Sequence, residues 1–162
     1  EHNKFKNNTG KDLKIIFEPG KFLVSDSGYF ITKVNYIKKS KNNNFVQVNS
    51  GFNHFIRPTL YNSYHEVINL SNPNDQKEEY TVVGYICEKD TLAEKRKISK
   101  ISKGDFLCFK NAGAYGYNMS SNYNSRLRPL ELCIHENSIK KIREKENLED
   151  LLKNQIDIFK LH

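Results

Sequence analysis

One stretch of nineteen residues, 111–129, limits the fold more than any other part of the chain. It reads NAGAYGYNMSSNYNSRLRP, with three tyrosines, four asparagines and two arginines but almost no aliphatic side chains. A segment so poor in core-forming residues is predicted to be a loop. Because loops on a rigid scaffold commonly carry function, a polar ligand explains its small residues, hydroxyls and amides better than packing does. Composition alone fits a turn-rich surface loop about equally well, since asparagine is frequent in turns.

Short apolar runs separated by turn residues make up most of the remaining chain. Such runs predict strands, which we expect at 13–17, 22–39, 45–49, 80–87, 105–111 and 129–135. A helix is expected over 58–70, because Pro58 suits a first helical turn and apolar residues follow at roughly helical spacing. A second, amphipathic helix is expected over 147–159, with an apolar face of Leu148, Leu151, Leu152, Ile156 and Phe159. The pattern predicts a mainly β chain with accessory helices.

The basic balance of the chain does not predict a nucleic-acid partner. The 162 residues carry a formal net charge of +7, but the lysines occur in short groups among acidic and apolar residues, as on solvated faces. No nucleic-acid recognition motif accompanies them. No apolar run approaches the roughly 20 residues that a membrane span needs. We therefore expect neither nucleic acid nor membrane among the partners.

The cysteines and histidines are dispersed. Cys87, Cys108 and Cys133 are odd in number and far apart, so they predict neither a disulfide framework nor a metal knuckle. The five histidines form no HxH or HExxH motif, and no metal site is predicted. Free cysteines favour a reducing compartment, so a cytoplasmic location is expected.

Four motifs in order resemble one enzyme family. They are FEPGKFLV at 17–24, GFNHFIRPTLYNSYHE at 51–66, VGYICEKDTLA at 83–93 and GAYGYNMSSNYNSRLRP at 113–129. Together they resemble the C-terminal portion of the diaminopimelate decarboxylases, which are fold-type III enzymes that use pyridoxal phosphate. The resemblance implies conversion of meso-2,6-diaminopimelate to L-lysine and carbon dioxide, the last step of lysine biosynthesis. It also implies a homodimer with a shared active site.

The same resemblance implies a domain plan. Residues 1–20 would be the end of a TIM barrel that is otherwise missing, with 13–17 as its last strand. Residues 21–140 would form a β-barrel or β-sandwich domain of the alanine-racemase-like type, and residues 141–162 a C-terminal helix. The family's cofactor-binding lysine lies in the barrel, and no lysine of this chain has a recognisable context for it. The chain also begins with Glu rather than Met, so we expect a piece of a longer protein that is inactive by itself.

Glu18, Pro19 and Gly20 end the first apolar run, and an ordinary strand-ending turn explains them from the sequence alone. The resemblance implies instead that they lie against the cofactor phosphate and that Lys21 binds substrate. The family usually has arginine at this position. Lysine keeps the charge but loses the two-pronged fork of the guanidinium, so carboxylate binding there is expected to be weaker.

Arg57 and Tyr61 lie four residues apart in IRPTLY, so both can face one ligand if both lie at the start of a helix. A guanidinium can grip a carboxylate with two parallel hydrogen bonds. An exposed arginine beside a core tyrosine is the alternative, and the sequence alone favours it. The resemblance implies that both residues bind substrate. Tyr115, between small neighbours in GAYG, is implied to contact both the cofactor phosphate and the substrate.

Cys87 ends an apolar run and is followed by Glu88. A thiol is mostly protonated at neutral pH and can give a proton to a carbanion, although a lone cysteine in a strand is usually a small buried apolar residue. The resemblance implies that Cys87 is the proton donor in the active site of the partner subunit and that Glu88 binds the distal ammonium group of the substrate.

Two alternatives stay open. A related decarboxylase could act on ornithine, arginine or a carboxylated polyamine, which lack the distal amino-acid group that Arg57 would bind. The chain could also belong to a non-catalytic regulatory module that pairs with an active homologue.

Overall fold

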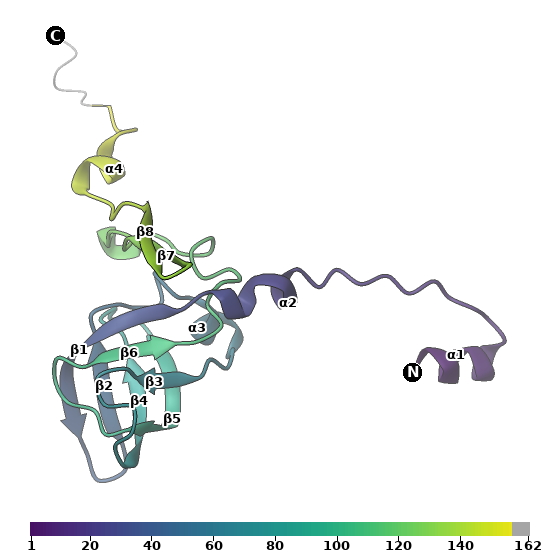
Figure 1. Ribbon diagram of the computed structural model, residues 1–162, viewed down its shortest axis with the longest axis horizontal. Coiled ribbons are helices and arrows are strands. Elements are labelled where there is room, and N and C mark those ends of the chain that lie inside the picture. Colours follow the sequence, from purple (N-terminus) through teal and green to yellow (C-terminus); the bar gives the residue numbers. More distant parts are fainter. Residues whose placement is uncertain (157–162) are drawn as a thin grey trace.

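The computed structural model describes residues 1–156, and its body is one curled sheet. The strands are β1 (Phe30–Lys39), β2 (Asn44–Val48), β3 (Val67–Asn69), β4 (Lys77–Val83), β5 (Thr91–Ser99) and β6 (Phe106–Phe109). Their order is β3-β6-β1-β2-β4-β5, and the neighbours are antiparallel except for the parallel pair β2 and β4. The edge strands β3 and β5 lie next to each other, so the sheet nearly closes into a barrel (Figure 1). The expected mainly β, barrel-type fold is confirmed.

The core is formed by the side chains that point into this barrel. Along β1 the residues alternate, with Thr32 and Val34 buried and Ile31 and Lys33 exposed, as a strand with one covered face requires. The register pairs Val34 with Val48 across β1 and β2. Other buried members are Val46, Phe55, Val67, Tyr80, Val82, Leu92, Ala93, Ile98, Ile101, Leu107 and Phe109.

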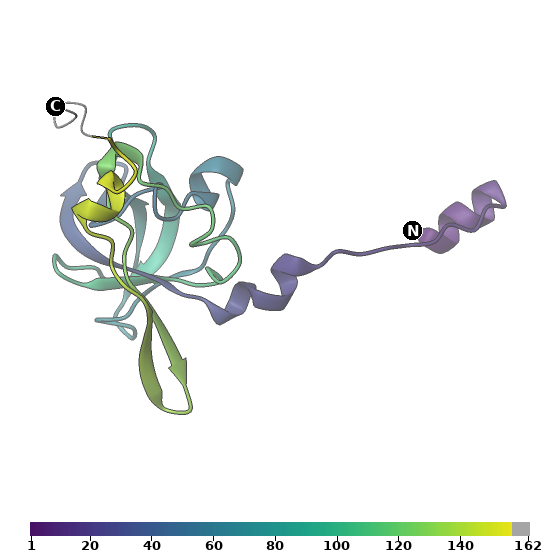
Figure 2. The ribbon, with the colours of Figure 1, turned by 90° about the horizontal axis from the view of Figure 1, so that it is seen from above.

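A hairpin and a short helix extend from the barrel. The hairpin consists of β7 (Glu131–His135) and β8 (Ser138–Arg143) and projects from the barrel (Figure 2). Most of its side chains are exposed. The helix α4 (Leu148–Leu152) begins with a capping box, in which the Asn147 side chain accepts from the Asp150 amide and the Asp150 carboxylate accepts from the Asn147 amide. In residues 1–156, no helix has both the length and the apolar character to cross a membrane.

The N-terminal segment extends away from the barrel. The helix α1 (His2–Thr9) is joined through an irregular stretch to α2 (Gly20–Val24) and the single 3-10 turn η1 (Ser25–Ser27), which lead into β1 (Figures 1 and 2). The strand expected at 13–17 is absent here. Ile16 and Phe17 are 73% and 79% exposed, and no strand within residues 1–156 lies beside them to complete a ladder. A strand needs a neighbour for its backbone hydrogen bonds, so an unpaired apolar run stays irregular.

Three other expected elements differ from the structure. The strand expected at 22–39 starts only at Phe30, because residues 20–27 form α2 and η1. The helix expected at 58–70 is the single turn α3 (Arg57–Tyr61), which ends where Asn62 takes a left-handed conformation, and the chain then enters β3. The helix expected at 147–159 covers only Leu148–Leu152, and residues 157–159 lie outside the described part of the chain.

The sequence did not predict β5, whose exposed face carries Glu94, Lys95 and Lys97. Its buried positions lie at the two ends of the strand, where Leu92 and Ala93 precede the charged residues and Ile98 and Ser99 follow them. Lys95 and Lys97 are therefore solvated, as expected for the lysines of this chain. The strands expected at 45–49, 80–87, 105–111 and 129–135 correspond to β2, β4, β6 and β7, and their ends agree to within four residues.

Removing the hydroxyl of Tyr80 should destabilise the barrel. Tyr80 is 1% exposed, and its hydroxyl donates to Glu78 and accepts from the Ile101 amide at 3.1 Å each. Tyr80→Phe leaves the buried Ile101 amide without this partner, which should lower the free energy of unfolding by about 1–3 kcal/mol. Urea unfolding would measure the change, with Tyr36→Phe on the exposed face of β1 as the control. Equal stability of the two variants would contradict this role.

Candidate functional site

Two segments far apart in the sequence cross with their backbones in direct contact. One is η1 with the following Gly28, and the other is the start of the 111–129 loop. The Ala112 amide donates to the Gly28 carbonyl at 2.8 Å, and the Gly113 amide donates to the Ser25 carbonyl at 3.0 Å. A Cβ on Gly28 would lie 2.3 Å from the Gly113 nitrogen, and one on Gly113 would lie 2.1 Å from the Val24 carbonyl oxygen. This glycine crossing therefore has no room for side chains, and it holds the segment that carries Lys21 against the loop.

A cavity of about 610 Å³ opens beside the glycine crossing. Its lining residues come from the α2 region, the loop before β3 and the start of the 111–129 loop: Glu18, Pro19, Lys21, Phe22, Ser25, Asp26, Tyr64, His65, Asn111 and Tyr115. Tyr115 has a φ of 63°, a left-handed conformation that is uncommon for an aromatic residue and recurs at ligand sites. The structure thus brings four expected site residues, Glu18, Pro19, Lys21 and Tyr115, to one cavity.

Arg57 lies between two tyrosines of the expected site. Its guanidinium carbon is 5.4 Å from the ring centre of Tyr61 and 5.3 Å from that of Tyr115, both within the range of cation–π attraction. Its Nε is shielded from solvent and has no hydrogen-bond partner among residues 1–156. Arg57 and Tyr61 therefore lie side by side, and Tyr115 joins them.

His65 lies on the loop between α3 and β3 and was not expected at the site. It is 4% exposed, packs edge-on against Phe55 with ring centres 4.6 Å apart, and contributes to the cavity wall. Its Nδ1 is 2.9 Å from the Lys110 carbonyl. Burial lowers the pKa of His65, and the charges of Arg57 and Lys21 lower it further. The motif GFNHFIRPTLYNSYHE contained it, but a buried histidine gives no sequence signal of its own.

Cys87 and Glu88 lie on a separate exposed loop between β4 and β5. The Cys87 thiol donates to the Glu88 carboxylate at 3.4 Å. The other carboxylate oxygen of Glu88 accepts from the Tyr123 hydroxyl, and this hydrogen bond lowers the pKa of Glu88. Neither Cys87 nor Glu88 lines the cavity that contains Lys21 and Tyr115. The structure therefore divides the expected site residues between two places.

Asp90 holds the Cys87 loop in position. Its carboxylate accepts from the Phe52 amide at 2.7 Å and from the Ile86 amide at 2.9 Å. Asp90 is 5% exposed, and burial raises its pKa although both hydrogen bonds oppose that change. The carboxylate thus ties the segment before Cys87 to the GFN segment that precedes Arg57. Neither Asp90 nor Tyr123 was expected from the sequence to contribute.

Several polar side chains of the 111–129 loop bind the protein itself. Arg128 donates to Ser120 and to Glu146, whose carboxylate also accepts from Asn122. Burial alone would raise the pKa of Glu146, but the hydrogen bonds from Arg128 and Asn122 outweigh it and lower the pKa. Tyr117 lies beneath the guanidinium of Arg143 at 3.9 Å. Most of this loop is therefore a structural element, and only Asn111 and Tyr115 of it face the cavity.

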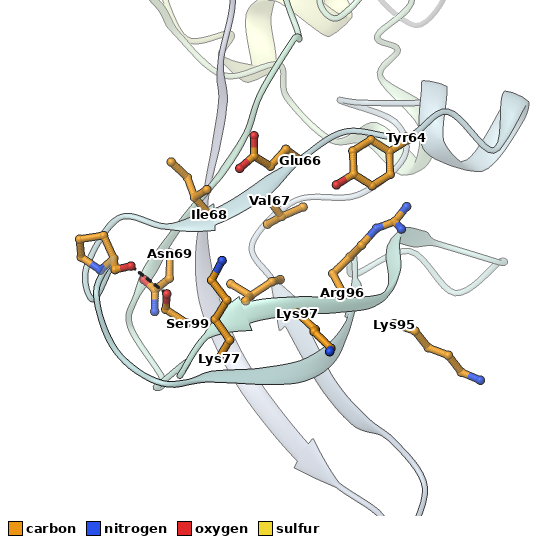
Figure 3. Close-up of a pocket in the computed structure, with 12 residues that line it drawn as sticks. Tyr64, Glu66, Val67, Ile68, Asn69, Lys77, Lys95, Arg96, Lys97 and Ser99 are labelled. Carbon is orange, nitrogen blue, oxygen red and sulfur yellow. Dashed lines mark hydrogen bonds between the residues drawn. The ribbon is translucent and has the colours of Figure 1, made fainter.

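A second cavity, of about 440 Å³, lies at the seam where β3 and β5 approach without pairing (Figure 3). Arg96 lies 4.3 Å from the ring centre of Tyr64, and the Ser99 hydroxyl donates to the Pro73 carbonyl at 2.9 Å. None of the expected site residues lines this seam. Across the part of the chain that the structure describes, no group of three potential metal ligands is placed to hold an ion.

The nearly closed barrel and the polar cavity beside it can now be compared with known domains. The family model for the pyridoxal-dependent decarboxylase C-terminal sheet domain matches residues 21–113, and the chain belongs to this family. A relative named diaminopimelate decarboxylase from Campylobacter jejuni is 45% identical over 144 residues, which cover 87% of this chain and 35% of the relative.

Solved structures agree with this membership. The diaminopimelate decarboxylase from M. jannaschii in co-complex with L-lysine has a TM-score of 0.81 and 34% identity, and the match covers 96% of this chain and 36% of that one. The enzyme from Helicobacter pylori complexed with L-lysine has a TM-score of 0.76 and 41% identity, with 89% and 36% covered. The chain spans about a third of the length of the curated relatives it matches.

Adding a methyl group at the glycine crossing should disrupt it. In Gly113→Ala the new Cβ would overlap the Val24 carbonyl, so the backbone of one segment has to move. Overpacking of this kind typically costs about 1–3 kcal/mol, and thermal unfolding of the purified protein would measure the loss. Gly20→Ala is the control for stability, since a Cβ there would meet nothing within 4 Å. Equal melting temperatures for the two variants would contradict the close crossing.

Acidification should destabilise the domain in part through His54. The buried His54 donates from Nε2 to the Leu127 carbonyl at 3.0 Å and accepts at Nδ1 from the Ser50 hydroxyl at 2.8 Å. Burial lowers its pKa below the ordinary 6.5. The unfolded chain therefore takes up a proton at higher pH than the folded chain, so the free energy of unfolding falls as the pH drops below 6.5.

Replacing His54 by Gln should flatten this fall, as measured by urea unfolding between about pH 7.5 and about pH 5. Some pH dependence should remain, because burial also lowers the pKa of His65. A slope in the variant as steep as in the wild type would show that His54 is not a source of it.

Proposed function

We propose that the protein containing this chain is a diaminopimelate decarboxylase, which converts meso-2,6-diaminopimelate to L-lysine and carbon dioxide with pyridoxal phosphate as cofactor. The observation that carries the proposal is the identity of 35–45% to proteins of that name, over 85–91% of this chain. Two structural relatives hold L-lysine, the product of this reaction. The activity would place the protein at the last step of lysine biosynthesis.

Lys21, Tyr115 and the open backbone at Gly20 suit the phosphate end of pyridoxal phosphate, and they share the cavity with the carboxylates of Glu18 and Asp26. The ammonium of Lys21 and the hydroxyl of Tyr115 suit an anion. Space above Gly20 is open beside Glu18 and Pro19, since a Cβ on Gly20 would meet nothing within 4 Å. We assign Glu18, Pro19, Gly20 and Tyr115 to the phosphate. When bound, the cofactor supplies an electron-accepting ring for the electron pair left by departing carbon dioxide.

Arg57 and Tyr61 are assigned to the carboxylate at the far end of the substrate. The guanidinium of Arg57 lies between the Tyr61 and Tyr115 rings and offers its outer nitrogens as a planar fork. Tyr61 is 58% exposed, so its hydroxyl is free to reach a ligand. Lys21 and Tyr115 would also contact substrate. Lys21 provides a point charge without the fork that arginine would give at this position.

Cys87 is assigned as the proton donor to the substrate carbon, and Glu88 as the acceptor for the distal ammonium group. The thiol is exposed and points its hydrogen towards Glu88. Because both residues lie outside the cavity with Lys21 and Tyr115, their position supports a homodimer in which Cys87 of one copy serves the cavity of the other. All three cysteines lie within the described residues and are free, in keeping with a cytoplasmic location.

The test is carbon dioxide release by the full-length gene product with pyridoxal phosphate, offered meso-diaminopimelate or ornithine. Release from meso-diaminopimelate only is expected, and none from the 162-residue chain alone. Arg57→Ala should lower kcat/KM for meso-diaminopimelate by about 10- to 100-fold, because hydrogen bonds to a charged group are lost. The kcat/KM of Arg57→Lys should lie between those of the wild type and Arg57→Ala, since lysine keeps the charge but lacks the fork of the guanidinium.

Activity on ornithine alone would overturn the substrate assignment, since ornithine has no distal carboxylate for Arg57. A full-length protein that neither binds pyridoxal phosphate nor releases carbon dioxide from either compound would instead indicate a non-catalytic module. An Arg57→Ala variant as active as the wild type on meso-diaminopimelate would remove Arg57 from the site while keeping the reaction.

A further inference from the structure

The cavity at the open seam of the barrel, called the seam cavity below, carries an excess of positive charge. It has a volume of about 440 Å³, and the cations on its wall are Lys77, Lys95, Arg96 and Lys97. Glu66 is the one carboxylate among the described lining residues, and it already pairs with Lys110 at 2.9 Å. Within residues 1–156, none of the four cations forms an ion pair. The charge of the seam cavity is therefore available to an anion.

Two of the cations face the cavity from separate positions. Figure 3 shows the Lys77 ammonium and the Arg96 guanidinium directed towards β3, and Lys95 directed away from it. The guanidinium carbon of Arg96 is 4.3 Å from the ring centre of Tyr64, which holds it at one end of the cavity. Lys77 is paired with Ser99, three residues beyond Arg96 on β5. The two cations are thus attached about 10 Å apart along the strands, at a rise of about 3.4 Å per residue.

The wall between these two cations is mainly apolar. Val67 on β3 and Ile98 on β5 are buried and line the cavity. The polar neighbours Asn69 and Ser99 are already engaged, because the Asn69 amide and the Ser99 hydroxyl donate to other groups of the protein. Apolar walls with a few convergent charged groups are typical of sites for small organic molecules. The arrangement suits a hydrocarbon chain with an anionic group at each end.

We propose that the seam cavity binds a small aliphatic dicarboxylate, with one carboxylate at Arg96, the other at Lys77 and the methylene chain along Val67 and Ile98. Nε of Arg96 is shielded from solvent, so the two outer nitrogens of the guanidinium receive the carboxylate as a fork. The inference goes beyond the proposed function and does not depend on it. Within residues 1–156, Tyr64 is the one residue that lines both this cavity and the cavity assigned to the cofactor.

The test is calorimetric titration of the full-length protein with adipate, an aliphatic dicarboxylate, and with hexanoate, which has the same carbon chain but one carboxylate. Arg96→Gln and Lys77→Gln each remove one of the two charges. Lys39→Gln is the matched control, since Lys39 is an exposed lysine at the end of β1 and does not line the cavity. Thermal unfolding of each variant reports whether it is folded at the assay temperature.

The Kd of adipate should rise by about tenfold in Arg96→Gln and in Lys77→Gln, and should change by less than about twofold in Lys39→Gln. Arg96→Lys should lie between the wild type and Arg96→Gln, because lysine keeps the charge without the fork. Hexanoate should bind at least about tenfold more weakly than adipate, because it leaves one of the two cations without a partner.

Three results would overturn the seam site. They are adipate binding that is unchanged in Arg96→Gln, equal affinity for adipate and hexanoate, and no heat of binding with adipate. Inorganic phosphate serves as a further probe, and Arg96-dependent binding of phosphate without binding of adipate would also overturn the dicarboxylate assignment. Adipate binding lost in Arg57→Ala but kept in Arg96→Gln would place the diacid in the other cavity. Carbon dioxide release tests the proposed function separately, so failure of one does not imply failure of the other.

Discussion

The candidate site depends on the glycine crossing between Gly28 and Gly113. The barrel can form without Lys21 or Tyr115, since neither belongs to its core. What brings them together is the pair of backbone hydrogen bonds at a separation that admits no Cβ on either glycine. The strands β1 and β6 pair directly beyond the crossing. The paired strands therefore fix the positions of the α2–η1 segment and of the start of the 111–129 loop. A stable sheet thus positions a loop and a short helix precisely enough for ligand recognition, although neither has a core of its own.

Two buried polar atoms without hydrogen-bond partners lie where the ligand is proposed to bind. They are Nε of Arg57, the first residue of α3, and Nε2 of His65, on the loop that follows this helix. Other buried or half-buried charged side chains have hydrogen-bond partners. Asp90 accepts two amides, and Arg128 and Glu146 share several hydrogen bonds with the 111–129 loop. Unpartnered atoms also occur at Thr32, Asn53 and Arg96, so the assignment of Arg57 depends on its place between Tyr61 and Tyr115 and not on the unpartnered atom alone.

The sequence predicted the architecture better than the individual elements. The short apolar runs between turn residues mark segments that become buried strands, so the β class and most strands could be predicted from them. The helix expected from Pro58 failed because Asn62 turns left-handed and Val67 finds a strand partner in β6, a long-range contact with no local signal. Motif resemblance supplied Lys21, Arg57 and Tyr115. It could not supply Tyr123 or His65, whose relevance comes from the residues that folding places beside them.

The separation of the two groups of site residues constrains how a complete active site is assembled. The Tyr123 hydroxyl binds the Glu88 carboxylate, and Asp90 binds the Ile86 amide just before Cys87. The Cys87 thiol is exposed. A proton donor meant for its own cavity would face inwards and share a wall with Lys21 or Tyr115, which Cys87 does not. An exposed donor on a loop anchored this firmly suits delivery to a neighbouring molecule, because anchoring limits the entropy lost when the loop docks. Glu88 accepts from Tyr123 and pairs with no cation within residues 1–156, so in the proposed dimer its charge would be available for an ammonium group of the substrate.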